Sequence, residues 1–427
     1  MSEATLKIVA LALFGMMYVG IICFPKIKMW VALAVAAFYV ILGVLPLGQL
    51  LGAINWNALM MIIGTMLIVY YFIESQMPNR IADGLLRKAP NVMWVTILMS
   101  LFSGIVSAFI DNVATVLMVA PVGIAVCNKL KINPVGMIIA IAVSSNLQGA
   151  ATLVGDTTSI MLAAHAQMDF IDFFWMNGRP GMFFAVELGA VATIPIMMIL
   201  FRKDRQSVRS EVRTDVSDHI PSVMLVFMVV LLIAASFIPN KPDTTNGLIC
   251  MALALLTMIV ESIRAKNVKN IVEAVSSVDF ETIGLLTALF CVIAGITNIG
   301  IIDDFAEWIV KVGGNNLFLL YTMIVWGSVL ISAFVDNIPY VATMLPVLSA
   351  VTMRMGLEPY LLYFGLLSGA TLGGNLTPVG ASANITGTGL LRKQGYEVKF
   401  KDFARIGIPF TLAAVLMGYL FLWLFWR

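Results

Sequence analysis

Residues 107–112 read SAFIDN and residues 332–337 read SAFVDN, two nearly identical hexapeptides separated by 225 positions. Prolines, threonines and glycines recur at the same offset: Pro121 and Pro346, Pro134 and Pro359, Thr152 and Thr377, Gly155 and Gly380. A match without gaps over about fifty residues indicates an internal duplication. The chain is therefore predicted to consist of two halves with the same fold.

The composition around these repeats is typical of a membrane protein. Of the 427 residues, 60% are hydrophobic and 12% are charged, whereas a soluble domain carries about 25% charged residues. So few charges cannot cover a water-facing surface, which excludes a soluble enzyme, a nucleic-acid-binding protein and a disordered chain. The apolar stretches are continuous rather than alternating, which excludes a β-barrel. The predicted fold class is an all-α polytopic membrane protein.

Ten apolar runs are long enough to cross a bilayer, which takes about 20 residues. They lie at 5–24, 29–47, 57–73, 133–165, 181–201, 221–238, 246–262, 282–297, 360–391 and 406–426. The runs 133–165 and 360–391 are too long and polar in the middle, which predicts broken helices. Two further stretches, 92–127 and 316–352, carry a central Asp-Asn pair. Each is either one overlong span or a re-entrant hairpin.

The distribution of basic residues decides between these alternatives. With two hairpins, 20 of the 26 Lys and Arg residues fall on one side, among them Lys28 in the loop after the first span. With single crossings this bias shrinks. We therefore predict ten spans and two hairpins, with the basic side in the cytoplasm and both termini outside. The predicted location is the prokaryotic inner (plasma) membrane.

This topology divides the chain into two inverted repeats of five transmembrane helices plus one re-entrant hairpin each. Residues 1–205 form the first repeat, 206–220 a charged cytoplasmic linker and 221–427 the second repeat. Five spans in each repeat invert the second copy relative to the first. The first hairpin then enters from the cytoplasm and the second from outside. Inverted repeats whose broken helices meet at the midplane are typical of transporters.

The two hairpin tips and the two helix breaks place polar residues at membrane depth. Glycine and proline open the helices there, so freed carbonyls can coordinate a cation and helix N-termini can receive an anion. The side-chain oxygens of Asp, Asn, Ser and Thr suit hard cations. The candidate substrate- and ion-binding residues are Asp111, Asn112, Thr115, Asn146, Thr152, Asp156, Asp336, Asn337, Asn375, Thr377, Ser382 and Asn384.

Several interpretations of these residues remain open at this point. The Asp-Asn pairs can simply cap the second helix of each hairpin, although a carboxylate at membrane depth is costly unless a cation or proton neutralises it. Asp156 aligns with Ala381, so it is a proton site, a specialised ligand or a solvated residue. Sodium at Asn112 and Asn337 is one candidate ion. The cysteines and histidines show no metal-binding spacing, and no metal or cofactor is predicted.

The motifs SAFIDNVATVLMVAPV, SAFVDNIPYVATMLPV and GGNLTPVGASANITGTGLLRKQGY resemble the ion transporter superfamily. The nearest resemblance is to its arsenite permease and melanosomal P protein branch, which is CitMHS-like and related to sodium/proton antiporters and divalent anion/sodium symporters. Dicarboxylate and citrate carriers of the superfamily have Ser-Asn-Thr at the hairpin tips. The aspartates found here disfavour a di- or tricarboxylate substrate, because like charges repel.

The resemblance implies a homodimer held by a scaffold domain and an elevator-type transport domain, mapped here to about 78–165 and 299–391. It implies coupling to protons or sodium within the lipid bilayer, with no nucleic-acid partner and no enzymatic activity. Any ATP would come from a soluble ATPase subunit, because the chain has no Walker A pattern. The leading hypothesis is proton-coupled export of arsenite, antimonite or a related small inorganic anion. A sodium/proton antiporter is the alternative, and a dicarboxylate symporter is less favoured.

Overall fold

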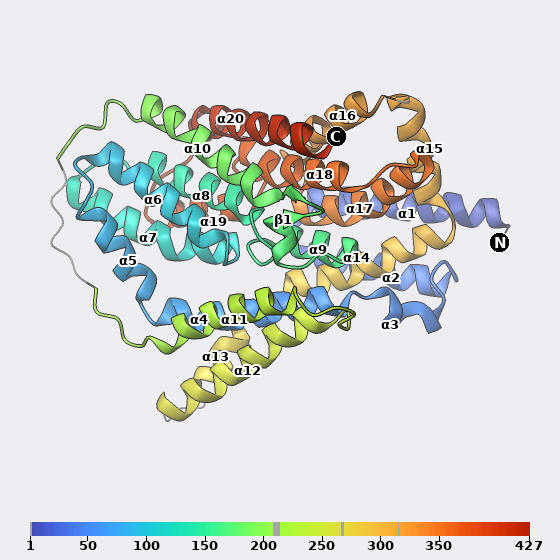
Figure 1. The fold of residues 1–427 in the computed structure, drawn as a ribbon, viewed down its shortest axis with the longest axis horizontal. Coiled ribbons are helices and arrows are strands. Elements are labelled where there is room, and N and C mark those ends of the chain that lie inside the picture. Colours follow the sequence, from blue (N-terminus) through green and yellow to red (C-terminus); the bar gives the residue numbers. More distant parts are fainter. Residues whose placement is uncertain (1, 208–213, 266–268, 315) are drawn as a thin grey trace.

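The protein folds almost entirely into helices, as shown in the computed structural model of residues 2–207, 214–265, 269–314 and 316–427 (Figure 1). The first half contains α1 (Glu3–Cys23), α2 (Lys28–Ile41), α3 (Leu50–Ala53), α4 (Trp56–Glu74), α5 (Met77–Leu86), α6 (Val92–Ser107), α7 (Asn112–Leu130), α8 (Val135–Gly149), α9 (Thr157–Ala166) and α10 (Met182–Leu200). The second half contains α11 (Ile220–Ala235), α12 (Thr245–Ala265), α13 (Lys269–Ser276), α14 (Phe280–Asn298), α15 (Ile301–Gly313), α16 (Leu317–Ser332), α17 (Asn337–Met355), α18 (Tyr360–Gly373), α19 (Ser382–Lys393) and α20 (Phe400–Trp426).

Short elements join these helices. The 3₁₀ turns are η1 (Pro25–Ile27), η2 (Leu47–Gln49), η3 (Ile171–Phe173) and η4 (Gly374–Leu376). Strands β1 (Trp175–Met176) and β2 (Arg179–Pro180) form a small antiparallel ladder between α9 and α10. The predicted all-α membrane fold is confirmed.

The duplication is visible in the ends of the helices. Helix α16 begins and ends 225 positions after α6, and α17 begins and ends 225 positions after α7. The packing repeats as well, because α6 lies against α8 and α16 lies against α18. Helices α6 and α7 lie toward the left end of the molecule, whereas α15 and α16 lie toward the right end (Figure 1).

Each hairpin turns at its Asp-Asn pair because the aspartate caps the second helix. The Asp111 carboxylate accepts hydrogen bonds from the backbone N–H groups of Val113 at 3.0 Å and Ala114 at 3.3 Å. Asp336 accepts the corresponding bond from the N–H of Ile338 at 3.3 Å. A side-chain acceptor at this position satisfies backbone donors that the helix leaves free. Capping by the aspartate therefore determines where the second helix of each hairpin begins.

The two helix breaks pack tightly against the hairpins at a glycine. A Cβ added to Gly155 would lie 2.6 Å from the carbonyl oxygen of Gly149 and 2.7 Å from that of Ser107. A Cβ on Gly380 would lie 2.6 Å from the oxygen of Gly374 and 2.8 Å from that of Ala333. No side chain fits at such distances, so only glycine lets the broken segments approach the hairpin tips.

The helix lengths differ from the ten spans that the sequence predicts. Within the described residues, eight helices are long and apolar enough to cross a membrane: α1, α4, α7, α10, α12, α14, α17 and α20. Helices α2 and α11 have only 14 and 16 residues, and each broken span divides into two short helices. The second helices of the hairpins, α7 and α17, have 19 residues each and are themselves long enough to cross a membrane. The short helices α3, α5, α13 and α15 were not predicted.

The predicted linker 206–220 includes residues 208–213, which lie outside the described residues. The described linker residues on either side of this gap form hydrogen bonds with the first half. The N–H of Val92 donates to the carbonyl of Gln206 at 3.1 Å. Thr214 donates both its N–H and its hydroxyl to the Asp83 carboxylate, at 2.7 Å each. These bonds attach both flanks of the linker to the segment that contains α5 and the start of α6.

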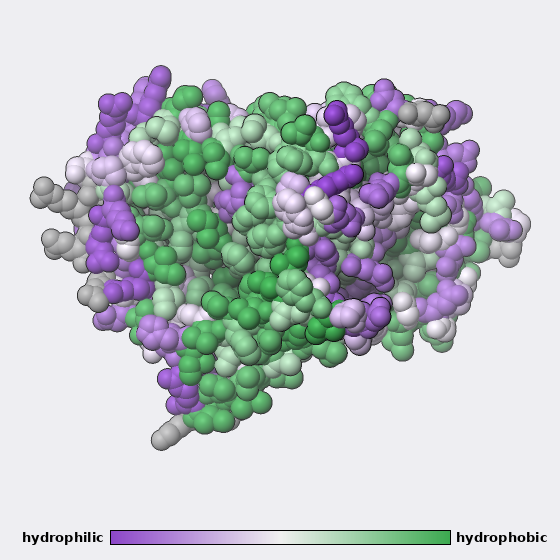
Figure 2. All heavy atoms as spheres, viewed as in Figure 1, coloured by the Kyte–Doolittle hydropathy of each residue, from purple (hydrophilic) through white to green (hydrophobic). Residues whose placement is uncertain are grey.

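The molecular surface agrees with a membrane location. Hydrophobic residues cover the broad middle of the face shown in Figure 2, and hydrophilic residues gather toward its left and right ends. Exposed apolar side chains of α10, α11 and α12, such as Val191, Val226 and Ile259, are more than half accessible. Contiguous exposed apolar surface of this extent is stable in contact with lipid rather than water.

Candidate functional site

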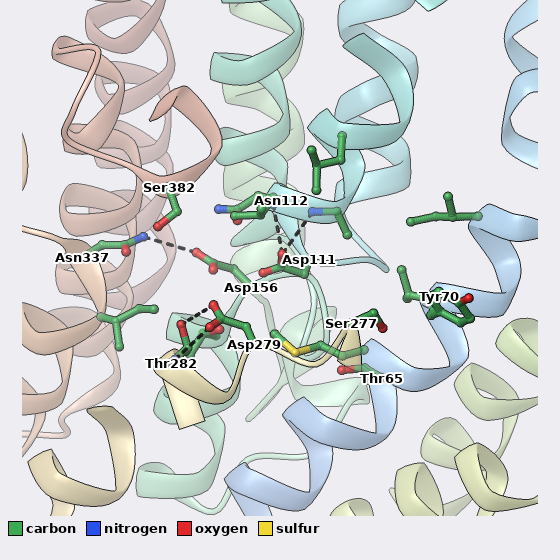
Figure 3. A pocket seen from close by; sticks show the side chains of 18 residues that line it. Thr65, Tyr70, Asp111, Asn112, Asp156, Ser277, Asp279, Thr282, Asn337 and Ser382 are labelled. Carbon is green, nitrogen blue, oxygen red and sulfur yellow. Dashed lines mark hydrogen bonds between the residues drawn. The ribbon is translucent and has the colours of Figure 1, made fainter. Parts of the chain in front are cut away.

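A cavity of about 310 Å³ lies where the two halves meet (Figure 3). The first hairpin tip, the N-terminus of α9, the second hairpin tip, the middle of α4 and the start of α14 surround it. Its polar lining consists of Thr65, Tyr70, Asp111, Asn112, Asp156, Thr157, Ser277, Asp279, Thr282, Asn337 and Ser382. Six of the predicted site residues are thereby brought together: Asp111, Asn112, Asp156, Asn337 and Ser382 on the wall, and Asn146 behind Asn112.

The first hairpin tip supplies one carboxylate and one amide to the cavity. While Asp111 caps α7, the Asn112 amide donates to the Oδ1 of Asn146 at 2.9 Å. Asn112 is 5% exposed and Asn146 is fully buried. The amide therefore has a fixed orientation, because its buried partner on α8 has no alternative solvent contact.

Asp156 joins the two halves of the molecule. It precedes the first residue of α9, is 4% exposed, and accepts a hydrogen bond from the Thr158 hydroxyl at 2.9 Å. The Asn337 amide, from the second hairpin tip, donates to the same Asp156 oxygen at 3.5 Å (Figure 3). A carboxylate so deeply buried is stable only with a proton, a cation or hydrogen-bond donors beside it.

The helix breaks meet behind the cavity at equivalent positions of the two repeats. The Asn146 amide donates to the carbonyl of Thr371 at 2.7 Å, and these residues are 225 positions apart. It also contacts the Oδ1 of Asn375 at 3.1 Å, while the Asn375 amide donates to the carbonyl of Val143 at 2.9 Å. Because Asn146 and Thr371 are equivalent residues, their contact places them at the pseudo-twofold axis. Asn146 and Asn375 connect the two repeats through these hydrogen bonds.

Four of the predicted ligands form hydrogen bonds elsewhere in the fold. The Thr152 hydroxyl donates to the carbonyl of Ala108, and the Thr377 hydroxyl donates to that of Ala333 at 2.6 Å. Both hydroxyls thus fasten a helix break to a hairpin. Thr115 donates weakly to Ile110 at 3.4 Å, and Asn384 donates to Gly374 and Thr377 at 3.0 Å each. Thr115, Thr152, Thr377 and Asn384 do not line the cavity.

Replacing Thr377 with Val should therefore destabilise the protein. The buried carbonyl of Ala333 loses its donor, and an unsatisfied buried acceptor costs about 1 to 3 kcal/mol of unfolding free energy. Thermal unfolding in detergent measures the loss. Thr297→Val is the control, because its hydroxyl bonds only within its own helix, to Ile293, at an exposed position. A Thr377→Val protein of wild-type stability would contradict this role.

Asp336 lies outside the 310 Å³ cavity, although the sequence places it beside Asp111. Its Oδ2 forms a salt bridge with the Lys28 ammonium at 2.8 Å. Both residues line a neighbouring cavity of about 880 Å³, and Ser382 contributes to both cavities. Lys28 is the first residue of α2, so it contacts a hairpin tip rather than standing free in a loop.

Sequence reasoning missed the contribution of the α13–α14 connection. Asp279 caps α14 by accepting from the N–H of Thr282 at 3.0 Å and from its hydroxyl at 2.6 Å. Its carboxylate lines the cavity with Ser277, while Thr65 reaches it from α4. An aspartate directly before an apolar run predicts a helix cap. It does not predict which other helices the aspartate lies beside, so the sequence could not place Asp279 at this cavity.

The electrostatic character of the cavity is acidic. Asp111, Asp156 and Asp279 contribute carboxylates, and no Lys, Arg or His belongs to the described lining. Across the described chain, no cluster of three or more His, Cys, Asp or Glu residues has the geometry of a metal site. The mixed carboxylate, amide and hydroxyl lining can bind a proton, a monovalent cation or an uncharged polyhydroxy molecule.

Comparisons with known proteins agree on a transporter. The family model described as "Citrate transporter" (CitMHS) matches residues 18–347 and 247–427. An uncharacterized transporter of Mycobacterium tuberculosis strain H37Rv is 30% identical over 429 residues, covering 98% of each chain. The human P protein is 24% identical over 475 residues, covering 92% of this chain and 56% of its own.

A solved structure shares the fold. The YdaH transporter of Alcanivorax borkumensis, whose crystal structure is described as having an unusual topology, aligns with a TM-score of 0.61. The alignment covers 88% of this chain and 86% of that one at 13% sequence identity. Identity at this level supports a common fold and no further property.

Proposed function

The chain belongs to the CitMHS transporter family, and on that premise we propose that it is an ion-coupled secondary transporter whose exchangeable cation binds between Asp111 and Asp156. Family membership makes it a membrane transporter and not an enzyme. The observation that carries the proposal is the acidic cavity at the junction of the repeats, lined by three carboxylates without a described basic side chain. A pair of carboxylates of this kind, with Asp156 buried and Asp111 half-buried, favours a bound proton or Na⁺.

The substrate that fits best is small and inorganic. Free di- or tricarboxylates are repelled by Asp111 and Asp156, whereas an uncharged trihydroxy acid can hydrogen-bond to both amides and carboxylates. Arsenite has this form at neutral pH. We infer proton-coupled export of arsenite, antimonite or a related small inorganic anion, with Asn112, Asn337 and Ser382 as hydrogen-bonding residues on the cavity wall.

Sodium/proton antiport is the second candidate. It is supported by the number of hard oxygen ligands around the cavity, including the hydroxyls of Thr65 and Thr157 beside the carboxylates. Oxygen ligands of this kind suit hard cations. In this case Na⁺ and protons compete for Asp111 and Asp156, and no further substrate is required.

We propose an elevator movement for either substrate. The hairpins α6–α7 and α16–α17, with the broken helices α8–α9 and α18–α19, form the moving unit because their tips and breaks line one side of the cavity and pack on one another. The remaining long helices form the scaffold and the surface of a homodimer. The proposed orientation in a prokaryotic inner membrane has both termini outside, and the ion gradient replaces an ATPase subunit.

Flux measurements in proteoliposomes test these proposals. Under an imposed proton gradient, arsenite, Na⁺, chloride and a dicarboxylate are compared for gradient-driven transport. Arsenite flux that collapses with the proton gradient supports export, and Na⁺ flux coupled to opposite proton movement supports antiport. Dicarboxylate flux driven by Na⁺, with neither of the other activities, would overturn both candidates.

A further inference from the structure

The two Asp-Asn tips occupy equivalent positions in the repeats but have different charge environments. Asp336 pairs with Lys28 at 2.8 Å, and the two side chains are only 19% and 16% exposed. Asp111 forms no salt bridge with any residue that the structure describes. We propose that Lys28 is a built-in cation for the Asp336 tip, and that it limits the transporter to one exchangeable cation, bound at Asp111 and Asp156. This inference rests on the proposed cation coupling.

Local structure does not explain a lysine at position 28. Lys28 is the first residue of α2, where the helix dipole disfavours a positive charge. The rest of α2 is apolar. The one described carboxylate within ion-pair distance of Lys28 is Asp336. Asp279 and Glu281 also attract Lys28, over a longer distance. The direct pair with Asp336 is the contact that holds the ammonium at the second tip.

A second contact fixes the geometry of this pair. The Tyr18 hydroxyl donates to the carbonyl of Pro339 at 2.7 Å and lies 2.6 Å from the hydroxyl of Thr343. Tyr18 is on α1, and both of its partners are in the first two turns of α17. The α1–α2 pair therefore holds the start of α17 on one side while Lys28 reaches the cap residue Asp336.

The charges on the two sides of the molecule are distributed unequally. The acidic cavity carries Asp111, Asp156 and Asp279. The repeat equivalents of the last two are Ala381 and Asn55, the residue that caps α4 as Asp279 caps α14, and neither bears a charge. The neighbouring cavity is balanced, with the basic Lys28 and Arg392 and the acidic Asp336 and Glu397. An added cation is attracted to the acidic cavity, whereas the Lys28 ammonium already occupies the place of a cation beside Asp336.

Removing the ammonium should therefore create a second cation site. In Lys28→Gln the Asp336 carboxylate has no described cation within ion-pair distance, so Na⁺ binds there as it binds at the first tip. The measurement is the midpoint of thermal unfolding of purified full-length protein in detergent, titrated with NaCl at constant ionic strength against N-methyl-D-glucamine chloride. A ligand that binds only the folded state raises the free energy of unfolding, and each additional binding site adds to this effect. In Lys28→Gln the unfolding midpoint should therefore rise more steeply with the logarithm of Na⁺ concentration than in the wild type, by the amount that one additional bound Na⁺ contributes.

Three variants separate this inference from the proposed function. Lys28→Arg keeps the charge and should titrate like the wild type, and Lys28→Gln/Asp336→Asn should lose the added site. Asp111→Asn tests the first site independently, because the inference depends only on the difference between Lys28→Gln and the double variant. An equal Na⁺ dependence in those two proteins overturns it.

The experiment remains decisive if Lys28→Gln is unstable. Rescue of its folding by Na⁺, and not by N-methyl-D-glucamine, supports a cation site at Asp336. Rescue by the second substitution Asp336→Asn without any response to Na⁺ would make the pair purely structural and overturn the inference.

Discussion

Gradient-driven flux is expected to fall about 100-fold in Asp156→Asn and in Asp111→Asn, a loss equivalent to about 2.8 kcal/mol of binding free energy. Each substitution keeps the size of the side chain and removes the charge that holds the cation. Asp156 is the more sensitive position, because it is almost fully buried and also accepts the Asn337 amide from the other repeat. Flux in proteoliposomes over roughly pH 5.5 to 8.5 measures the coupling to the proton gradient.

Substrate counterflow separates binding from coupling in these variants. Exchange of labelled substrate without a gradient should continue, because the amides Asn112 and Asn337 remain. Asp304→Asn is the control, since Asp304 is an exposed carboxylate that pairs with Lys7 at 2.5 Å and does not line the cavity. Gradient-driven flux with wild-type pH and Na⁺ dependence in Asp111→Asn/Asp156→Asn would remove both aspartates from the coupling mechanism.

Transport should fall sharply, with folding retained, in Asn337→Ala and in Asn112→Ala. Asn337 supplies the amide that reaches Asp156 from the second repeat, and Asn112 orients its amide on Asn146 at 2.9 Å. The expected fall in flux is at least about 10-fold in each variant, because each loses one hydrogen bond to a buried polar side chain, worth about 1.5 kcal/mol or more. Size-exclusion elution and thermal unfolding verify folding.

Asparagines in the same hairpins provide matched controls for this result. Asn91 caps α6 by accepting from the N–H of Trp94 at 3.1 Å, and Asn316 caps α16 by accepting from that of Leu319 at 3.1 Å. Their replacement by Ala should cost about 1 kcal/mol of stability and leave flux per folded molecule unchanged. Equal flux in Asn337→Ala and Asn316→Ala would assign the hairpin tips to helix capping alone.

Local chemistry explains why the hairpins are readable in the sequence. A capping aspartate starts a helix within two residues of itself, and a glycine without a Cβ allows a close approach that no other residue permits. These signals recur at an offset of 225 in Asp111 and Asp336 and in Gly155 and Gly380. The helix ends of α6, α7, α16 and α17 follow them closely, since capping depends on neighbouring residues alone.

Hydropathy predicts the length of a membrane span poorly, because an apolar run can continue past the residue where the helix ends. The apolar runs 29–47 and 221–238 were predicted as full spans, but α2 and α11 stop after 14 and 16 residues. Helix α2 ends before Gly43, which has a φ of 74°, a conformation that glycine adopts without strain. Residues 44–46 beyond that point form a loop before η2 and α3.

The sequence alone determined that this chain is an all-helical membrane protein with two copies of one hairpin-containing repeat, because composition, periodicity and helix caps act over short distances. Only the tertiary structure decided which polar residues meet. Lys28 and Asp336 are 308 positions apart and Asp156 and Asn337 are 181 apart. Threonines of identical local pattern bond to hairpin carbonyls instead of lining the cavity. The direction of a side chain at a helix break depends on the helices packed around it, and no local signal encodes that packing.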